Sequence, residues 1–274
     1  MKENGLKLLV AGGAGFIGGN FVHHWVRVHP EDRVVVLDAL TYAGNRATLG
    51  PLESSGRIAF VHGDVRDGPL VDRVLADHGI DTLVHFAAES HVDRSILGPE
   101  AFVQTNVLGT QVLLDAARRS WCKDGTWRPD VRFHQISTDE VYGTLAPTDP
   151  PFTERTPYAP SSPSAASKAA ADHLVRASEH THGLPTSITN CSNNYGPYQF
   201  PEKLVPLVIV NVLEGRPIPI YGDGLQIRDW LYVEDHCVAI ERVLEADAAG
   251  SSYNVGGRAE RTNLEVVKRL CSLL

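Results

Sequence analysis

The sequence has few cysteines, and none of them are paired at short spacing. The four are Cys122, Cys191, Cys237 and Cys271, which are far apart and form no CxxC pattern. Zinc sites and disulfide frameworks need cysteines at characteristic spacings. The sequence therefore indicates neither of these, and we expect four ordinary buried thiols and no metal ion.

Long hydrophobic runs and an excess of positive charge are also missing. No stretch approaches the ~20 apolar residues of a membrane span, and the first six residues are too polar for a signal peptide, so we expect a cytoplasmic protein without a membrane partner. With 25 Lys and Arg against 33 Asp and Glu, the formal net charge is −8 at pH 7. This argues against nucleic acid as a partner, because phosphate binding needs concentrated basic residues.

Short apolar runs rich in β-branched residues alternate with segments of helical periodicity through the first 190 residues. This alternation is typical of an α/β fold, and it predicts a Rossmann-type doubly wound parallel sheet joined by right-handed crossovers. The expected strands are residues 6–11, 33–37, 58–62, 82–86, 132–137 and 186–190. The expected helices are residues 16–28, 69–78, 100–120 and 165–181.

The regular alternation stops after about residue 190, where Gly and Pro mark a series of turns. We expect one large domain over residues 1–190 and a smaller, mixed, substrate-facing part over 191–274, with the chain crossing back to the sheet. Two helices are predicted there, over residues 235–246 and 263–274. The second reaches the C-terminus without a Gly, Asn or Pro stop, so we expect this part to be incomplete.

A glycine motif runs from Gly12 to Gly18, between the first predicted strand and the first predicted helix. Glycines suit a pyrophosphate cradle because the backbone must approach the phosphates while the helix N-terminus faces them. Asp38 follows the second strand, where a carboxylate can bind the ribose 2′-hydroxyl and repel a 2′-phosphate. The motif thus predicts NAD rather than NADP, the alternative being a glycine turn beside a turn-capping aspartate.

Two further segments lie at the ends of predicted strands, and therefore at the carboxyl edge of the predicted parallel sheet. Asp64 ends the third strand and is a candidate for the adenine edge or, equally, a turn residue. The small residues of Phe86-Ala87-Ala88-Glu89-Ser90 end the fourth strand, where backbone can approach a cofactor. Tight packing of helix on strand is the alternative for this segment.

Thr138, Asp139 and Glu140 follow the fifth predicted strand and should face the same crevice. A dehydration beside a carbonyl needs one group to protonate the departing hydroxyl and another to remove a carbon-bound proton. Two neighbouring acids can divide these roles if their environments differ. The alternative is a helix cap by Asp139 beside a solvated Glu140.

Several blocks of the sequence resemble dTDP-glucose 4,6-dehydratases, in order and at compatible spacing over essentially the whole chain. The blocks are Gly12 to Gly18, Ala87-Ala88-Glu89-Ser90-His91-Val92-Asp93-Arg94-Ser95, Ser137-Thr138-Asp139-Glu140-Val141-Tyr142-Gly143, Asn193-Asn194-Tyr195-Gly196-Pro197-Tyr198 and Arg228-Asp229-Trp230. The resemblance implies that NAD takes hydride from sugar C4, that water is lost across C5 and C6, and that hydride returns to C6.

The same resemblance implies roles for individual residues. Thr138 would bind the sugar O4, Asp139 would protonate the leaving C6 hydroxyl, and Glu140 would remove the C5 proton. Lys168 would hold the nicotinamide ribose and lower the pKa of a tyrosine four residues earlier. This sequence has Ser164 at that tyrosine position, so we expect slow hydride abstraction, unless Ser164 simply starts the helix after Pro163.

The resemblance also implies two sets of ligand contacts. Those to NAD are Gly12, Gly15, Phe16, Ile17, Gly18, Asp38, Thr41, Asp64, Val65, Phe86, Ala87, Ala88, Ser90, Thr105, Lys168 and Asn194. Those to the nucleotide sugar are Ser90, Thr138, Asn193, Lys203, Leu204, Tyr221, Arg228 and Asn263. A solvated cation is the alternative for Lys203, and a helix cap for Asn263.

Other functions remain open at this point. A UDP-sugar epimerase or decarboxylase shares the fold, but an epimerase needs no acid and base pair across C5 and C6. A non-catalytic protein that binds NAD or a sugar nucleotide is favoured by Ser164 and by the short C-terminal part. The resemblance implies a homodimer formed through the helices predicted over residues 100–120 and 165–181.

Overall fold

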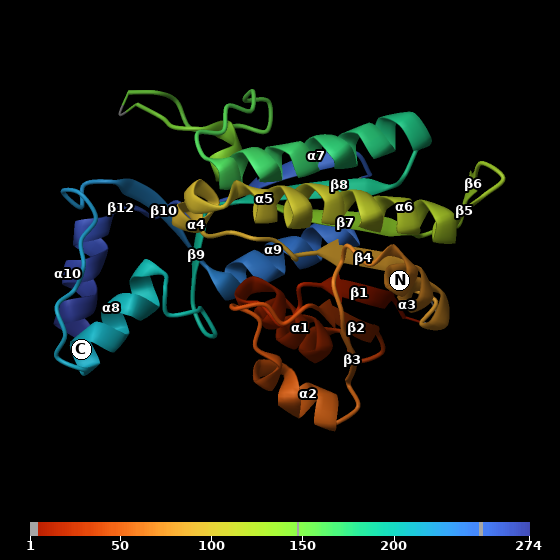
Figure 1. Cartoon of the computed structure of the whole chain (residues 1–274), viewed down its shortest axis with the longest axis horizontal. Helices are drawn as coiled ribbons and strands as arrows, with labels where there is room; N and C mark the ends of the chain where they lie inside the picture. Colours follow the sequence, from red (N-terminus) through yellow and green to blue (C-terminus); the bar gives the residue numbers. More distant parts are fainter. Residues whose placement is uncertain (1–4, 147, 247–248) are drawn as a thin grey trace.

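In the computed structural model, which describes residues 5–146, 148–246 and 249–274, a seven-stranded sheet runs through the molecule (Figure 1). Every neighbouring pair in it is parallel. In order across the sheet, the strands are β11 (Ser251–Val255), β8 (Thr186–Cys191), β7 (Arg132–Thr138), β4 (Thr82–His85), β1 (Lys7–Ala11), β2 (Arg33–Asp38) and β3 (Ile58–His62). The predicted Rossmann-type fold is confirmed.

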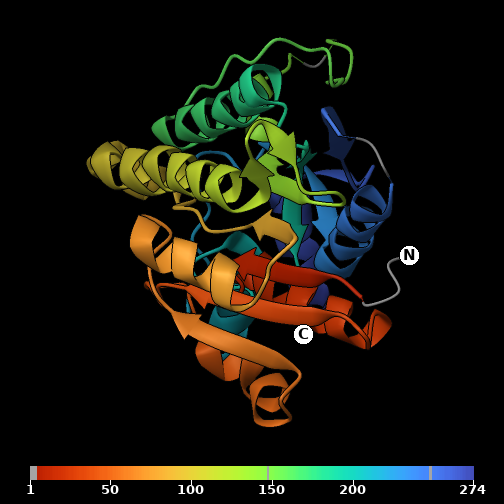
Figure 2. The same cartoon turned by 90° about the vertical axis from the view of Figure 1, so that its right-hand side faces the viewer.

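Helices cover both faces of this sheet, and each face buries its own apolar core. Helices α3 (Gly68–Asp77), α6 (Gly109–Trp121) and α7 (Pro163–His182) form a row on one side, while α9 (Val233–Glu245) lies on the other with α1 (Phe16–Val28) (Figure 2). Successive residues of β1 alternate between the cores, since Leu9 packs toward α3 and α6 and Leu8 toward α1. Burial on both faces explains the continuous apolar runs.

The predicted elements of the first 190 residues lie within two residues of the observed ones, apart from one long helix. The segment predicted over 100–120 is a helix, α5 (Pro99–Phe102), then a π-helical stretch, η2 (Val103–Leu108), and then α6. Such π stretches are rare and often lie at functional sites. The short elements η1 (Arg46–Leu49), α2 (Gly50–Ser54), α4 (Val92–Leu97), β5 (Cys122–Lys123) and β6 (Thr126–Trp127) were not predicted.

The C-terminal part contains a small three-stranded sheet. Its middle strand, β10 (Ile227–Tyr232), pairs in parallel with β9 (Asn193–Tyr195) and antiparallel with β12 (Glu260–Thr262). Helices α8 (Leu204–Leu213) and α10 (Asn263–Leu273) lie side by side at one end of the molecule (Figure 1). Strand β11 returns to the large sheet, so the two parts of the chain share it.

Two simple expectations can be checked at this level. In the described part of the chain, none of the helices has the length and apolar character needed to cross a membrane. The expectation of four buried thiols is wrong for two of them. Cys191 and Cys237 are buried, but Cys122 is only partly buried and Cys271 is exposed on the last helix, where the outer face of α10 meets solvent.

Candidate active site at the carboxyl edge of the sheet

The glycine loop between β1 and α1 brings backbone unusually close to backbone. Gly12 has φ +81°, and a Cβ atom there would overlap the backbone nitrogen of Ala87. A Cβ at Gly18 would likewise overlap the Gly12 carbonyl oxygen. Gly15 is the N-cap of α1 and provides no side-chain cap, so the first N–H groups of this helix stay available to an anion. This cradle fits a pyrophosphate, and Phe16 and Ile17 open the helix beside it.

Asp38, the last residue of β2, fixes the glycine loop from the side. Its carboxylate accepts the Ala14 N–H at 2.8 Å and the Leu40 N–H at 2.8 Å. The side chain is 8% exposed, and burial raises its pKa against the opposing effect of these two hydrogen bonds. Asp38 therefore caps the turn at the end of β2, and Thr41 is exposed in the loop that follows.

The other predicted NAD contacts follow β3 and β4. Asp64 is held by Arg66 in an ion pair, whose hydrogen bonds lower the pKa of the carboxyl, and Val65 is buried in the core beneath. The N–H groups of Phe86 and Ala87 both donate to the Ala11 carbonyl, at 2.8 and 2.9 Å. The loop from Ala88 to Ser90 is thus anchored directly against β1.

The π-helical stretch η2 supports the same loop from the other side. It contains Thr105 and the buried Asn106, whose amide accepts the Glu89 N–H at 2.8 Å and donates to the Glu89 carbonyl at 2.9 Å. Asn106 also donates to the Ser167 hydroxyl at 2.8 Å. The amide therefore joins the loop after β4 to helix α7. Sequence reasoning did not identify Asn106.

Thr138, Asp139 and Glu140 lie where β7 ends and a single 3₁₀ turn, η3 (Asp139–Tyr142), begins. Thr138 is the N-cap of this turn, and its hydroxyl accepts the Glu140 N–H at 3.3 Å. The alternative that Asp139 is the cap is therefore wrong. Asp139 is instead a half-buried acid at the carboxyl end of β7, and its Oδ1 accepts a hydrogen bond from the Thr138 hydroxyl at 3.4 Å.

The environment of Asp139 keeps its proton unusually tightly bound. Burial is the largest cause and the charges of Glu140 and Asp229 add to it, so that together they raise the pKa of Asp139 to about 7. A hydrogen bond from Thr138 and the charge of Arg228 act in the opposite direction. At neutral pH a large fraction of this carboxyl is protonated, as a general acid requires.

Lys168 and Ser164 lie in the first turns of α7. The Lys168 ammonium donates to the Ile136 carbonyl of β7 at 2.6 Å, and burial lowers its pKa. Ser164 is 4% exposed, and its carbonyl accepts the Ser167 hydroxyl at 2.7 Å. The N-cap of the helix is Ser162, whose hydroxyl accepts the Ala165 N–H. The alternative that Ser164 starts the helix is therefore wrong.

One turn after Lys168, Asp172 is fully buried and connects several elements of the site. Its Oδ2 accepts hydrogen bonds from Ser137 at 2.6 Å and from Tyr158 at 3.0 Å, and burial raises its pKa. The Tyr158 hydroxyl accepts a hydrogen bond from Arg176 at 2.8 Å, and burial raises its pKa too. Tyr158 is thus engaged away from Ser164. The four-residue spacing from Lys168 to Asp172 is the sequence signal that could have revealed this group.

The predicted nucleotide-sugar residues are distributed over the C-terminal part. Lys203 precedes Leu204, the first residue of α8, and its ammonium reaches the Ser90 carbonyl at 3.4 Å. Arg228 lies on β10, close enough to Asp139 to influence its pKa. The structure therefore brings Lys203 to the cofactor loop and Arg228 to the acid.

Four more predicted site residues lie in the C-terminal part, and they differ in how many contacts they make with the rest of the protein. Asn193 pairs with Trp230 across β9 and β10, and the Asn194 amide oxygen lies 3.0 Å from Nδ1 of His236. Asn263 is the first residue of α10 and not its cap, because Thr262 and Glu265 form a capping box there. Tyr221 is 71% exposed, and within the described ranges it makes no hydrogen bond to another predicted site residue.

Comparisons with known proteins agree with this arrangement. The family described as GDP-mannose 4,6 dehydratase matches residues 9–273. The dTDP-glucose 4,6-dehydratase of Xanthomonas campestris pv. campestris (strain B100) is 61% identical over 267 residues, covering 97% of this chain and 75% of that protein. The dTDP-glucose 4,6-dehydratase 1 of Escherichia coli K12 is 56% identical over 278 residues, covering 98% of this chain and 77% of that protein.

Solved structures of dTDP-glucose 4,6-dehydratases have the same fold as this chain. A dTDP-glucose 4,6-dehydratase of Streptomyces venezuelae, crystallised with NAD, superimposes with a TM-score of 0.90 at 49% identity, covering 97% of this chain and 80% of that one. The parallel sheet, the glycine cradle and the acid pair are thus found in a chain that is similar to these proteins over nearly its whole length. This chain belongs to the dTDP-glucose 4,6-dehydratase family of the extended short-chain dehydrogenases/reductases.

Proposed function

We propose that this chain converts dTDP-glucose to dTDP-4-keto-6-deoxyglucose. The observation that carries the proposal is the environment of Asp139, whose pKa is raised to about 7 at the carboxyl end of β7. An acid that keeps its proton at neutral pH can donate it to a departing hydroxyl, which a poor leaving group needs. An epimerase or a decarboxylase on this fold has no such hydroxyl to expel.

The cofactor in this proposal is NAD, which fits the Gly12 to Gly18 cradle. Bound NAD would supply reversible hydride transfer, removing hydride from C4 and returning it to C6 within one turnover. Gly12 and Gly18 would admit the pyrophosphate, and Asp38 would accept hydrogen bonds from the adenosine ribose. A 2′-phosphate would meet the Asp38 carboxylate and be repelled.

The elimination would be divided between the two acids. Glu140 would take the C5 proton, which a neighbouring C4 carbonyl makes acidic, while Asp139 would give its proton to the C6 hydroxyl and release it as water. Thr138 would hold O4 in place. Burial, together with the neighbouring charge of Glu140, raises the pKa of Asp139, which favours Asp139 as the acid and Glu140 as the base.

The step at C4 is the one that this chain would perform poorly. Lys168 is anchored on β7 through the Ile136 carbonyl, and it would hold the nicotinamide ribose. A serine at 164 is a far weaker acid than a tyrosine, and its side chain is several ångströms shorter, so it cannot take up the O4 proton as a tyrosinate would. We therefore propose that Ser164 limits turnover at the C4 step.

The nucleotide sugar would lie across the C-terminal part. Lys203 and Arg228 would neutralise the diphosphate, with Asn193, Leu204, Tyr221 and Asn263 around the nucleotide. An acidic protein with a diphosphate ligand must gather cations locally, and Arg228 lies close to the catalytic acid. This favours the division into an NAD-binding domain, 1–190, and a sugar-nucleotide part, 191–274. A cytoplasmic location stays a prediction.

A homodimer is part of the proposal. Apolar side chains are exposed along α4 and η2, beside α7: Ile96, Leu97, Val103 and Leu108 are 64%, 89%, 53% and 46% exposed. Contiguous apolar surface of this kind is typical of protein interfaces. The expected partner is a second copy packed on the helices over 100–120 and 165–181. Light scattering that gives a single-chain mass at micromolar concentration would contradict it.

The reaction is tested by incubating the protein, and a Ser164→Tyr variant, with dTDP-glucose and NAD and following the 4-keto-6-deoxy product by its absorbance in alkali. UDP-glucose is tested in parallel, because a UDP-sugar epimerase would convert it to UDP-galactose. Product from dTDP-glucose with either protein supports the proposal. UDP-galactose formation without any keto product, or ligand binding without conversion by both proteins, would contradict it.

A further inference from the structure

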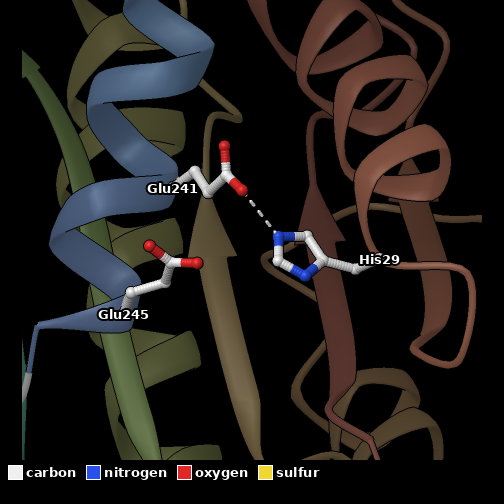
Figure 3. A group of neighbouring side chains, drawn as sticks. All are labelled: His29, Glu241 and Glu245. Carbon is white, nitrogen blue, oxygen red and sulfur yellow. Dashed lines mark hydrogen bonds and ion pairs between the residues drawn. The ribbon is translucent and has the colours of Figure 1, made fainter. Parts of the chain in front are cut away.

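A cluster of histidine and glutamate side chains joins α1 to α9, outside the proposed active site. His29 is the C-cap of α1, and Glu241 and Glu245 lie one turn apart on the same face of α9 (Figure 3). One ligand atom from each of the three lies within 4.8 Å of the others. His29 lies more than 200 positions before the two glutamates in the sequence, so no local spacing pattern could have predicted the cluster.

The imidazole of His29 is held rigidly in this position. Its ring stacks on the buried Trp25, with ring centroids 4.2 Å apart. Its Nε2 lies 2.8 Å from Oε1 of Glu241, as Figure 3 shows. A ligand that is oriented before the ion arrives loses little conformational freedom on binding.

The second oxygen of Glu241 is fixed by a chain of hydrogen bonds. Arg27 lies 3.3 Å from Nδ1 of His24. Because a guanidinium can only donate, Nδ1 is the acceptor, and His24 carries its proton on Nε2. That proton is donated to Oε2 of Glu241 at 2.7 Å. Glu241, 7% exposed, is thus a carboxylate with one oxygen anchored and the other facing His29, as second-shell contacts orient metal ligands.

Glu245 completes the group from the solvent side. Its side chain is 42% exposed, and its Oε2 accepts a hydrogen bond from Arg242 at 2.8 Å, which leaves Oε1 uncommitted. Burial alone would raise the pKa of Glu241, but hydrogen bonds from His24 and His29 outweigh it and lower the pKa. The cluster provides one imidazole nitrogen and two carboxylate oxygens.

We propose that His29, Glu241 and Glu245 bind a divalent transition-metal ion of the zinc class, with solvent in the remaining position. Imidazole with carboxylate suits Zn²⁺, Co²⁺ or Ni²⁺, whereas Ca²⁺ and Mg²⁺ prefer oxygen ligands alone. On binding, the ion replaces the hydrogen bond between Nε2 of His29 and Oε1 of Glu241. The site is structural, and it does not depend on the proposed reaction.

A metal ion bound at this cluster would join helix α1 to helix α9. Helix α1 follows the glycine cradle, and α9 follows β10, which carries Arg228. A metal across the two helices clamps the nucleotide-sugar part onto the NAD-binding domain. Ligation therefore stabilises the packing that brings Arg228 close to Asp139, and resistance to unfolding increases with metal concentration.

The test uses the full chain, freed of metal with a chelator and then titrated with ZnCl₂ by calorimetry. We expect one equivalent to bind saturably, and an excess near 100 times the dissociation constant to raise Tm by about 5 °C. Co²⁺ in place of Zn²⁺ should give the visible absorption of a site with nitrogen and oxygen ligands. His29→Ala and Glu245→Gln should each weaken binding by about tenfold or more.

Two matched variants control for the loss of any histidine or exposed carboxylate. His78→Ala removes another helix C-cap, at the end of α3, and Glu214→Gln removes another exposed glutamate paired with a nearby arginine. Both should bind zinc like the parent. Glu245→Gln changes an exposed residue, so the protein is expected to stay folded even if His29→Ala is unstable. No saturable uptake, or equal affinity in all variants, would overturn the proposal.

Discussion

Asp38 and Asp139 lie at the same edge of the large sheet, but the two regions around them are built differently. Asp38 accepts two backbone N–H groups at 2.8 Å each. Within the described ranges, the Asp139 carboxylate accepts one hydrogen bond, from the Thr138 hydroxyl at 3.4 Å, and faces the charges of Glu140 and Asp229. Burial raises the pKa of both, but only that of Asp139 reaches about 7.

The contrast shows how the site separates binding from chemistry. The cradle around Gly12 is made mostly from backbone groups, which do not titrate, so its shape depends less on pH than the protonation of Asp139 does. The catalytic end is made from ionisable side chains with few partners, where small changes in charge alter a protonation state. Perturbing the catalytic end should therefore change rates and pH profiles, while perturbing the cradle should change affinity and stability.

The largest effect is expected from Ser164→Tyr at the catalytic end. A phenol with a pKa of about 10 beside Lys168 can act as the base that the serine cannot, and a positioned base contributes ~10²–10⁴ in rate. We expect turnover of dTDP-glucose to rise by about this factor. Ser164→Phe, which fills the same space without a hydroxyl, is the control. An equal gain with phenylalanine, or no gain with tyrosine, would show that position 164 does not limit the reaction.

Asp139→Asn should lower turnover in the Ser164→Tyr background by about 10²–10³, because an amide cannot protonate the leaving hydroxyl. The Ser164→Tyr protein should lose activity as pH rises through about 7, where Asp139 ionises, and this limb should disappear from the residual activity once Asp139→Asn is added. If the Asp139→Asn variant kept full turnover and still lost activity as pH rose through about 7, the general acid would be another group.

The same substitution predicts a gain in stability. The Asp139 pKa in the folded protein, about 7, exceeds the ordinary value of 3.8 that applies in the unfolded chain. The folded state therefore binds more protons between these values, and the protein loses stability as pH rises from about 4 to 7, by up to about 4 kcal/mol. Asp139→Asn should unfold at a higher temperature than the parent at pH 8 and show little difference at pH 4, as followed by thermal denaturation.

In the cradle, Gly12→Ala should weaken NAD binding by about tenfold to a hundredfold. The new Cβ would overlap the Ala87 backbone, which cannot move without displacing the cofactor loop. Gly56→Ala is the matched control, because Gly56 also has a positive φ, +71°, but has open space around it. The control should lose only about 1–2 kcal/mol of stability and bind NAD normally. An equal loss of NAD affinity in Gly12→Ala and Gly56→Ala would show that the effect comes from backbone strain and not from the overlap with Ala87.

The same contrast explains how much of the molecule the sequence could predict. The strands of the large sheet are buried on both faces, so they appear as short apolar runs, and the cradle appears as a local glycine motif. Strand β10 is mostly exposed or half-buried and lacks such a run, and α8 is apolar on nearly all sides although only Val208 and Asn211 are buried. Neither has the periodicity that identifies an element.

The supporting groups of the catalytic end were missed for another reason. Asp172 joins Ser137 and Tyr158, which come from β7 and from the loop before α7, and such pairings depend on how distant segments pack. The raised pKa of Asp139 likewise depends on Asp229, ninety positions later. The local sequence was enough to identify Asp139 as a candidate acid. The pKa of Asp139 depends on contacts with distant residues, which secondary-structure propensity and residue spacing do not predict.

The smallest effect should come from Arg228→Gln, which tests whether the catalytic end is governed by charge. Arg228 lowers the pKa of Asp139 against the larger effects of burial and of Glu140 and Asp229, so its removal should move the alkaline limb of the pH profile upward by less than about one pH unit. The KM for dTDP-glucose should also rise, through loss of a diphosphate contact. Raising the salt concentration screens exposed charges, and should produce part of the same shift in the parent. A rise in KM with an unmoved pH limb would mean that Arg228 acts on the nucleotide alone and does not influence Asp139.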